Sequence, residues 1–77
     1  MKVAVYHPQK NVEEFEYVQM VVVPTPKGEK GFLPHHMTFM GEISKGEIQI
    51  QTTRPTKISV ERGYVHFDNN ICKIFCY

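Results

Sequence analysis

The sequence lacks tryptophan, has no long apolar run and contains only two cysteines among its 77 residues. Its longest apolar stretch lies near Met20 to Val23, far short of the roughly 20 residues that a membrane span requires. The N-terminus lacks the basic start and apolar stretch of a secretory signal, so a cytosolic protein is expected. The formal net charge is +1 with no basic block, so nothing favours a nucleic acid or an anionic membrane surface as partner.

The length sets the number of domains. At 77 residues the chain has room for one domain, expected to span residues 1–77. A domain of this size hides only about 60% of the surface that its unfolded chain exposes, so its core will be thin. A hydrophobic fraction of 42% with 22% charged residues is ordinary for a folded chain and argues against disorder.

Alternation of apolar and polar residues is the main structural signal. Ile48 and Ile50 oppose glutamate and glutamine neighbours, and Ile58 and Val60 oppose polar ones, which predicts half-buried strands. Apolar or alternating runs predict strands over 2–6, 17–24, 47–52, 57–61, 63–67 and 71–77. Turns are expected at "TRPT", because proline cannot donate to a ladder, and at "DNN".

Apolar residues do not recur at the spacing of an amphipathic helix over eight or more positions. Residues 39–47, "FMGEISKGE", are expected to supply at most one turn of helix, because Gly41 and Gly46 oppose more. Several short strands in so short a chain predict an all-β antiparallel sandwich or barrel.

The two cysteines are predicted to be unpaired. Cys72 and Cys76 lie four residues apart in one predicted strand, about 13 Å from each other at about 3.3 Å per residue. A disulfide needs Cα atoms within roughly 7 Å, so these two cannot bridge while that strand exists. We expect small core-facing side chains in a reducing compartment.

No set of residues forms a catalytic constellation. Ser44 and Ser59 lie outside any G-x-S-x-G elbow, and both cysteines belong to a strand where packing is the expected duty. Gly28 and Gly31 suggest a phosphate-binding loop, but the Gly-Lys-Ser/Thr ending is missing. The sequence therefore predicts no enzyme and no cofactor.

The segment "GEKGFLPHHM", Gly28 to Met37, reads as a loop with three possible roles: a reactive site, a metal site or a surface that another protein binds. Glu29, His35 and His36 could suggest a metal. Adjacent residues of an extended chain point in opposite directions, however, so the two histidines rarely reach one ion, and we expect no metal.

A protein-binding surface remains as the preferred interpretation of this loop. Aromatic residues and methionine are enriched at protein interfaces, and more apolar side chains gather here than a solitary monomer needs: Phe32, Leu33, Met37, Phe39 and Met40. The alternative is that Phe32, Leu33 and Phe39 close one end of the sandwich.

A family resemblance is carried by the order of four segments. "MVVVP", "GEKGFLPHH", "ISKGEIQI" and "ISVERGYVHF" together resemble the N-terminal β-sandwich domain of the epsilon subunit of the rotary proton-translocating ATP synthase. The family loop is Gly-Glu-x-Gly, an apolar pair and Pro-x-His, followed by a turn glycine and a Gly-Gly-aromatic-Val segment. The matching residues are Gly28, Glu29, Gly31, Pro34, His36, Gly46, Gly63, Tyr64 and Val65.

The resemblance implies a flattened sandwich of about ten strands that links the gamma subunit to the membrane ring of c subunits. It would be a non-catalytic rotor part, peripheral on the cytoplasmic face of the inner (plasma) membrane, without direct lipid insertion and monomeric when isolated. Contact with the c ring is implied for Glu29, Phe32 and His36, and contact with gamma for His7, Met40 and Glu42. A carboxylate at Glu29 could pair with arginine, and a histidine at His36 could respond to pH.

The chain departs from the family pattern in places. Proline and lysine occupy "TPKGEKG", and Arg62 replaces one of the paired glycines. Family members usually continue into two helices that restrain ATP hydrolysis and in some bacteria bind ATP, whereas this sequence stops at Tyr77 without a C-terminal helical domain. We therefore expect neither ATP binding nor helix-based inhibition.

Two competing interpretations stay open. A free-standing binding module would capture a peptide or sugar on one sheet face and would ignore gamma. A small metal-dependent enzyme would hold a stoichiometric metal at His35 or His36.

Overall fold

The structure, a computed structural model, describes residues 1–9 and 12–77. These residues form nine strands, and none of the described residues is helical. The strands are β1 (Lys2–Tyr6), β2 (Val12–Phe15), β3 (Met20–Thr25), β4 (Gly28–Phe32), β5 (Phe39–Ile43), β6 (Gly46–Gln51), β7 (Thr56–Val60), β8 (Gly63–Asp68) and β9 (Ile71–Cys76). The described part of the chain accordingly contains no helix that could cross a bilayer.

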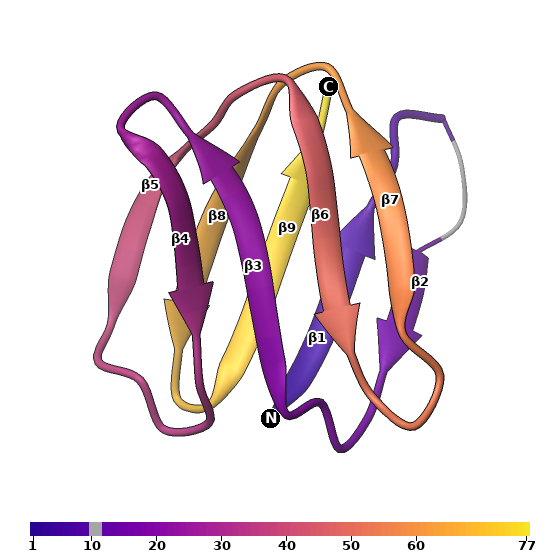
Figure 1. The fold of residues 1–77 in the computed structure, drawn as a ribbon, viewed down its shortest axis with the longest axis vertical. Helices are drawn as coiled ribbons and strands as arrows, with labels where there is room; N and C mark the ends of the chain where they lie inside the picture. Colours follow the sequence, from indigo (N-terminus) through magenta and orange to yellow (C-terminus); the bar gives the residue numbers. More distant parts are fainter. Residues whose placement is uncertain (10–11) are drawn as a thin grey trace.

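The strands form two stacked sheets (Figure 1), which confirms the predicted all-β sandwich. One sheet has five strands in the order β2-β1-β9-β8-β5, and the other has four in the order β4-β3-β6-β7. Neighbours are antiparallel except β1 and β9, which run parallel with Val3 opposite Cys72 and Val5 opposite Ile74. The first and last strands therefore lie together in the middle of one sheet.

Alternation places one side chain of every two in the core. Val65 and Phe67 of β8 face Ile48 and Ile50 of β6 across the interior, and all four are buried. The remaining buried side chains of this cluster are Val3, Val5, Val18, Val21, Val23, Phe32, Ile43, Val60, Cys72 and Ile74. Cys72 is thus a core residue as predicted, Cys76 is half-buried, and both thiols are free.

Three strands differ from the sequence prediction. Residues 39–43 form β5, where at most a turn of helix was expected, because Phe39 and Ile43 point inward and Glu42 points outward in strand alternation. Gly28–Phe32, interpreted as loop, forms β4 and pairs with β3. Strand β2 was not predicted, since its sequence "VEEF" is mostly charged.

The turn between β8 and β9 is tighter than "DNN" suggested. Asp68 still belongs to β8, and the turn consists of Asn69 and Asn70, whose φ angles are 51° and 62°. Two successive residues with positive φ make the hairpin turn that matches strand twist, and asparagine tolerates this conformation.

Candidate functional site

The candidate site lies along one side of the sandwich, where β4 and β5 are the edge strands of the two sheets (Figure 1). Residues 33–38 connect these strands at the lower end of this side. The rings of Phe32 at the end of β4 and Phe39 at the start of β5 have centroids 5.5 Å apart. The two edges are therefore joined by an aromatic contact as well as by the loop.

Phe32 is the centre of this side of the core and is 0% exposed. Its ring stacks on Phe67 at 5.6 Å and meets the edge of the His36 imidazole at 5.1 Å. The Lys30 ammonium lies 5.0 Å from the Phe39 centroid and 5.7 Å from that of Phe32. These contacts bring the loop histidine and a half-buried lysine onto one aromatic cluster.

The loop 33–38 is held in one conformation by the neighbouring β8–β9 turn. The His35 N–H donates to Asn70 Oδ1 at 2.8 Å, and the Thr38 hydroxyl donates to Asp68 Oδ1 at 3.0 Å. His35 has a φ of 68°, in the left-handed region that few residues other than glycine adopt. Fixed backbone at both ends of the loop makes this segment a preformed surface.

His36 stabilises the loop from inside. Its N–H donates to the Leu33 carbonyl at 3.1 Å, and its Nδ1 lies 2.7 Å from the Met37 carbonyl oxygen. Because a carbonyl can only accept, Nδ1 carries the hydrogen in this contact. The ring also contacts Phe67 at 5.6 Å, so the imidazole is half-buried.

What the loop presents to solvent is apolar. Leu33 is 59% exposed and Met37 is 77% exposed, and Met40, just inside β5, is also exposed. A rigid loop that holds large apolar side chains in water is typical of a protein-binding surface.

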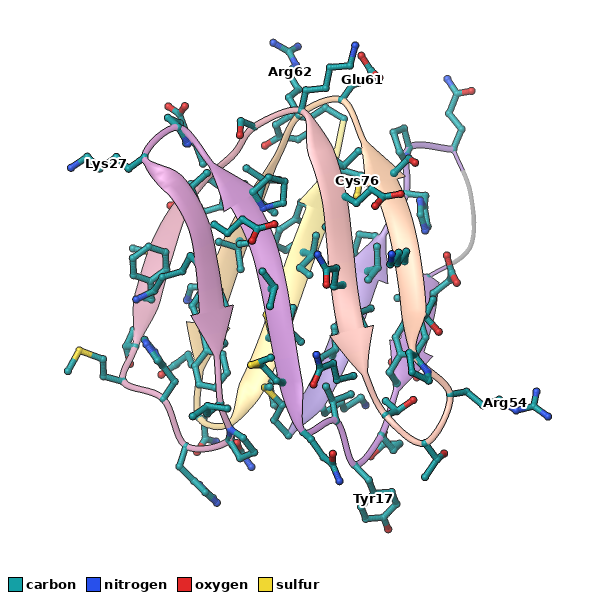
Figure 2. The ribbon with its side chains drawn as sticks, in the orientation of Figure 1. Tyr17, Lys27, Arg54, Glu61, Arg62 and Cys76 are labelled. Atoms are coloured by element: carbon teal, nitrogen blue, oxygen red, sulfur yellow. The ribbon has the colours of Figure 1, made fainter. Side chains whose placement is uncertain are left out.

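A cleft of about 410 Å³ lies at the opposite end of the same side, between the β3–β4 turn and β5. Figure 2 shows Lys27 projecting from this turn, at the end of the molecule away from the loop. Glu29 and Glu42 both line the cleft. By register, however, their side chains point to the outer faces of the two sheets, while Lys30 points between them.

The structure separates the residues implied in ring contact. Glu29 lies on the outer face near the start of β4, about 10 Å along the strand from Phe32. Phe32 is in the core, and His36 is half-buried under the loop. Any direct contact from these three would come from Glu29 and the loop surface, while Phe32 supports that surface from below.

The residues implied in gamma contact are also divided. Met40 and Glu42 share the outer face of β5. His7 follows β1, three strands away or about 14 Å, and its Nε2 pairs with Glu13 Oε1 of the β2 edge at 2.6 Å.

The histidine pair is not arranged as a metal site in the described ranges. His35 is exposed and His36 packs on Phe32 and Phe67, while Glu29 lies farther up β4. Residues 1–9 and 12–77 contain no group of three or more His, Cys, Asp or Glu side chains placed to hold one ion.

Sequence reasoning missed the residues that fix the loop. Asp68 and Asn70 were interpreted only as turn residues, although each binds the loop through its side chain. A pattern of neighbouring residues in the sequence cannot predict a hydrogen bond between residues that are 35 positions apart.

Comparison with known proteins places this geometry in a family. A family model described as "ATP synthase, Delta/Epsilon chain, beta-sandwich domain" matches residues 1–77. An ATP synthase epsilon chain from Pelagibacter ubique is 34% identical over 70 residues, covering 90% of this chain and 54% of its own length. One from Syntrophobacter fumaroxidans is 32% identical over 65 residues, covering 83% and 48%. The chain thus spans about half the length of the curated relatives it matches.

Solved structures show the same fold. A chain of the Tetrahymena thermophila mitochondrial ATP synthase, in a structure of the central stalk and c ring, superimposes with a TM-score of 0.83 and 16% identity over 97% of this chain and 61% of its own. A chain of the Euglena gracilis mitochondrial ATP synthase gives 0.83 and 15% over 96% and 48%. The family model covers every residue of the chain, which therefore belongs to the β-sandwich family of ATP synthase delta and epsilon chains.

Proposed function

We propose that residues 1–77 act as one domain of a non-catalytic rotor subunit that links the gamma subunit to the c ring. Membership of the delta/epsilon family supports this role, and so does the fold shared with chains from central-stalk and c-ring assemblies. The domain would have no active site of its own and would couple proton flow to ATP synthesis by transmitting torque. It would be peripheral, on the cytoplasmic face of the membrane that holds the ring.

One observation carries the proposal: the loop 33–38 is locked to the sandwich before any partner arrives. Two side-chain hydrogen bonds to the β8–β9 turn and the packed His36 ring leave Leu33 and Met37 uncovered on a fixed backbone. A coupler must transmit force without deforming, and a close-packed sandwich with an ordered contact loop meets that need. Preformed surfaces also bind without the entropy cost of ordering a loop.

In the proposed arrangement the c ring contacts Glu29 and the surface of the loop. Glu29 is exposed on β4 and can accept from arginine or amide groups of the ring. The gamma subunit contacts Met40 and Glu42 on the outer face of β5, with His7 as a separate, more distant contact.

The test of this proposal begins with binding of the chain to the gamma subunit and to the c ring of the same ATP synthase. Both should be retained on the immobilised chain. A free-standing binding module would retain neither, and that result would refute the rotor assignment.

A charge reversal then tests the ring contact. Glu29→Lys should weaken ring binding by about tenfold, about 1.4 kcal/mol, and lower ATP-driven proton pumping while soluble hydrolysis stays intact. Glu47→Lys is the matched control, because Glu47 is an exposed glutamate on β6 of the same sheet, two strands away. His36→Trp should act in the same direction as Glu29→Lys, with a melting curve to check that the loop still packs. Equal pumping with all three variants would remove Glu29 and the loop from the contact.

A further inference from the structure

The cleft of about 410 Å³ opens between the edge strands of the two sheets, and we call it the edge cleft. It lies between residues 25–30 on one side and Phe39, Gly41 and Glu42 on the other. Its walls are mostly apolar. Pockets that hold small organic molecules measure about 300–1,000 Å³, so the edge cleft is large enough for a small ligand.

Two glycines leave this space unfilled. Gly41 is an inward position of β5, between Phe39 and Ile43, where a larger side chain would continue the core. The Phe39 ring extends toward it instead, because a Cβ at Gly41 would meet atoms of that ring at 3.0 and 3.1 Å. A Cβ at Gly28, on the β4 side, would meet nothing within 4 Å. The core therefore stops at Phe39, whose ring forms the inner wall of the edge cleft.

Hydrogen bonds hold both sides of the edge cleft in place. The Thr25 hydroxyl donates to the Gly28 carbonyl at 2.5 Å and accepts from the Lys27 N–H at 3.2 Å, which fixes the β3–β4 turn. The Ser44 N–H donates to the Pro24 carbonyl at 2.9 Å and ties the end of β5 to β3. A ligand would enter a preformed space and would not have to order its walls.

The charge at the inner wall is the Lys30 ammonium. It lies 5.0 Å from the Phe39 centroid and 5.7 Å from that of Phe32, a cation held over two aromatic rings. Within residues 1–9 and 12–77, no carboxylate oxygen lies within 4.0 Å of this nitrogen. Lys30 is half-buried, whereas Lys27, the other lysine of the edge cleft, projects into solvent (Figure 2). An ammonium partly removed from water and without an acidic partner is a site for an anion.

The two acidic residues of the edge cleft stand at its rim. Glu29 and Glu42 point to the outer faces of the two sheets, while Lys30 points between them. One negative charge near Lys30 is therefore favourable, and a second one nearer the mouth would be repelled by both glutamates.

We infer that the edge cleft binds a small organic anion with a single negative charge and a flat apolar body, of which an aromatic carboxylate is the simplest. The carboxylate accepts from the Lys30 ammonium, and the ring packs on Phe39. A peptide strand added along β4 fits less well, because an inward lysine on an edge strand opposes pairing. The inference is independent of the proposed function, since it concerns the isolated chain and neither gamma nor the ring.

An NMR titration of the unchanged chain with 2-naphthoate tests the inference. The amide signals of Gly28, Lys30 and Gly41 should shift and saturate with a Kd of about 1 mM or tighter, while that of Lys57 on the opposite edge strand β7 should stay in place. Neutral 2-naphthamide should bind about tenfold more weakly, and so should the dianion 2-naphthyl phosphate. These comparisons need no variant and so do not depend on one that folds.

Lys30→Met tests the role of the cation, because methionine keeps an unbranched apolar side chain at this position. The substitution should weaken 2-naphthoate binding about tenfold or more and change 2-naphthamide binding by less than about threefold. A merely structural role of Lys30 would weaken both probes alike. Lys30→Arg, which keeps the charge, should retain 2-naphthoate, and Lys57→Met is the matched control because Lys57 is exposed on β7.

Several outcomes would overturn the inference. Absence of shifts at 10 mM 2-naphthoate would show that the edge cleft takes no such ligand, and shifts confined to other residues would place the probe elsewhere. Equal affinity for 2-naphthoate and 2-naphthamide, or full 2-naphthoate affinity in folded Lys30→Met, would remove the cation from the site. Tighter binding of 2-naphthyl phosphate than of 2-naphthoate would refute the restriction to one charge.

Discussion

Replacing Phe32 by alanine should mainly destabilise the fold. Its effect on binding to a partner should be small by comparison, because the side chain is buried. The ring is fully buried, and it touches Phe67, Phe39 and His36 at centroid distances of 5.1–5.6 Å, with the Lys30 ammonium at 5.7 Å. Deleting a buried phenylalanine ring costs about 3–5 kcal/mol, because the cavity closes only in part. A chain of 77 residues has a total stability of only about 4–12 kcal/mol.

The loss should appear as a large drop in melting temperature. At about 4–8 °C per kcal/mol for a domain of this size, Phe32→Ala should melt about 12–40 °C below the unchanged chain in circular dichroism. Leu33→Ala is the control, since Leu33 is the next residue and mostly exposed; it should change the free energy of unfolding by less than about 0.5 kcal/mol. Phe32→Ala melting within about 5 °C of the unchanged chain would refute the assignment of Phe32 to the core.

Two further predictions concern the five-stranded sheet. Gly63→Ala should lower the free energy of unfolding by about 1–3 kcal/mol in urea titrations, because a Cβ at this buried position would collide with the Phe75 carbonyl oxygen and push β8 away from β9. An unchanged urea midpoint would contradict that close approach. Burial raises the pKa of the Cys72 thiol from 9.0 to about 12. The unfolded thiol then loses its proton near pH 9 while the folded one keeps it, so stability is fully present below pH 9 and falls by about 1.4 kcal/mol per pH unit as the pH rises toward 12. Urea titrations between pH 8 and 11 should show this slope, and Cys72→Ala should remove that part of it; identical slopes would show an accessible thiol.

The strands that the sequence predicted correctly are those with one strongly apolar face. Ile48 and Ile50 in β6, and Val65 and Phe67 in β8, alternate with polar residues because one side of each strand is buried. Turn residues such as Pro55, which lies between β6 and β7, then mark where the strands end. This alternation was sufficient to predict the β-sandwich. The family resemblance was confirmed by the family model that matches residues 1–77.

The missed strands are edge strands with weak patterns. In β4 the inward positions include Lys30, and in β5 they include Gly41, so neither strand shows an apolar stripe. An inward lysine on an edge discourages pairing with other chains, which is a reason for the sequence to depart from alternation there.

The geometry of the site depended on contacts between distant segments. Local pattern could place His36 in a loop, but not the bond from Asn70 that fixes the neighbouring residue, nor the burial of Phe32 beneath it. The separation of His7 from Met40 likewise follows from the strand order, which no alternation encodes.

The adjacency of β1 and β9 has a consequence for biosynthesis. Since β9 is made after the other eight described strands, β1 and β8 have no neighbour between them until residues 71–76 emerge from the ribosome. Until then the valine-rich segments of the nascent polypeptide can associate with other chains, and such non-local pairing favours capture by chaperones. A product that stops before Ile71 would have a gap at the centre of its larger sheet, and we expect proteases to remove it.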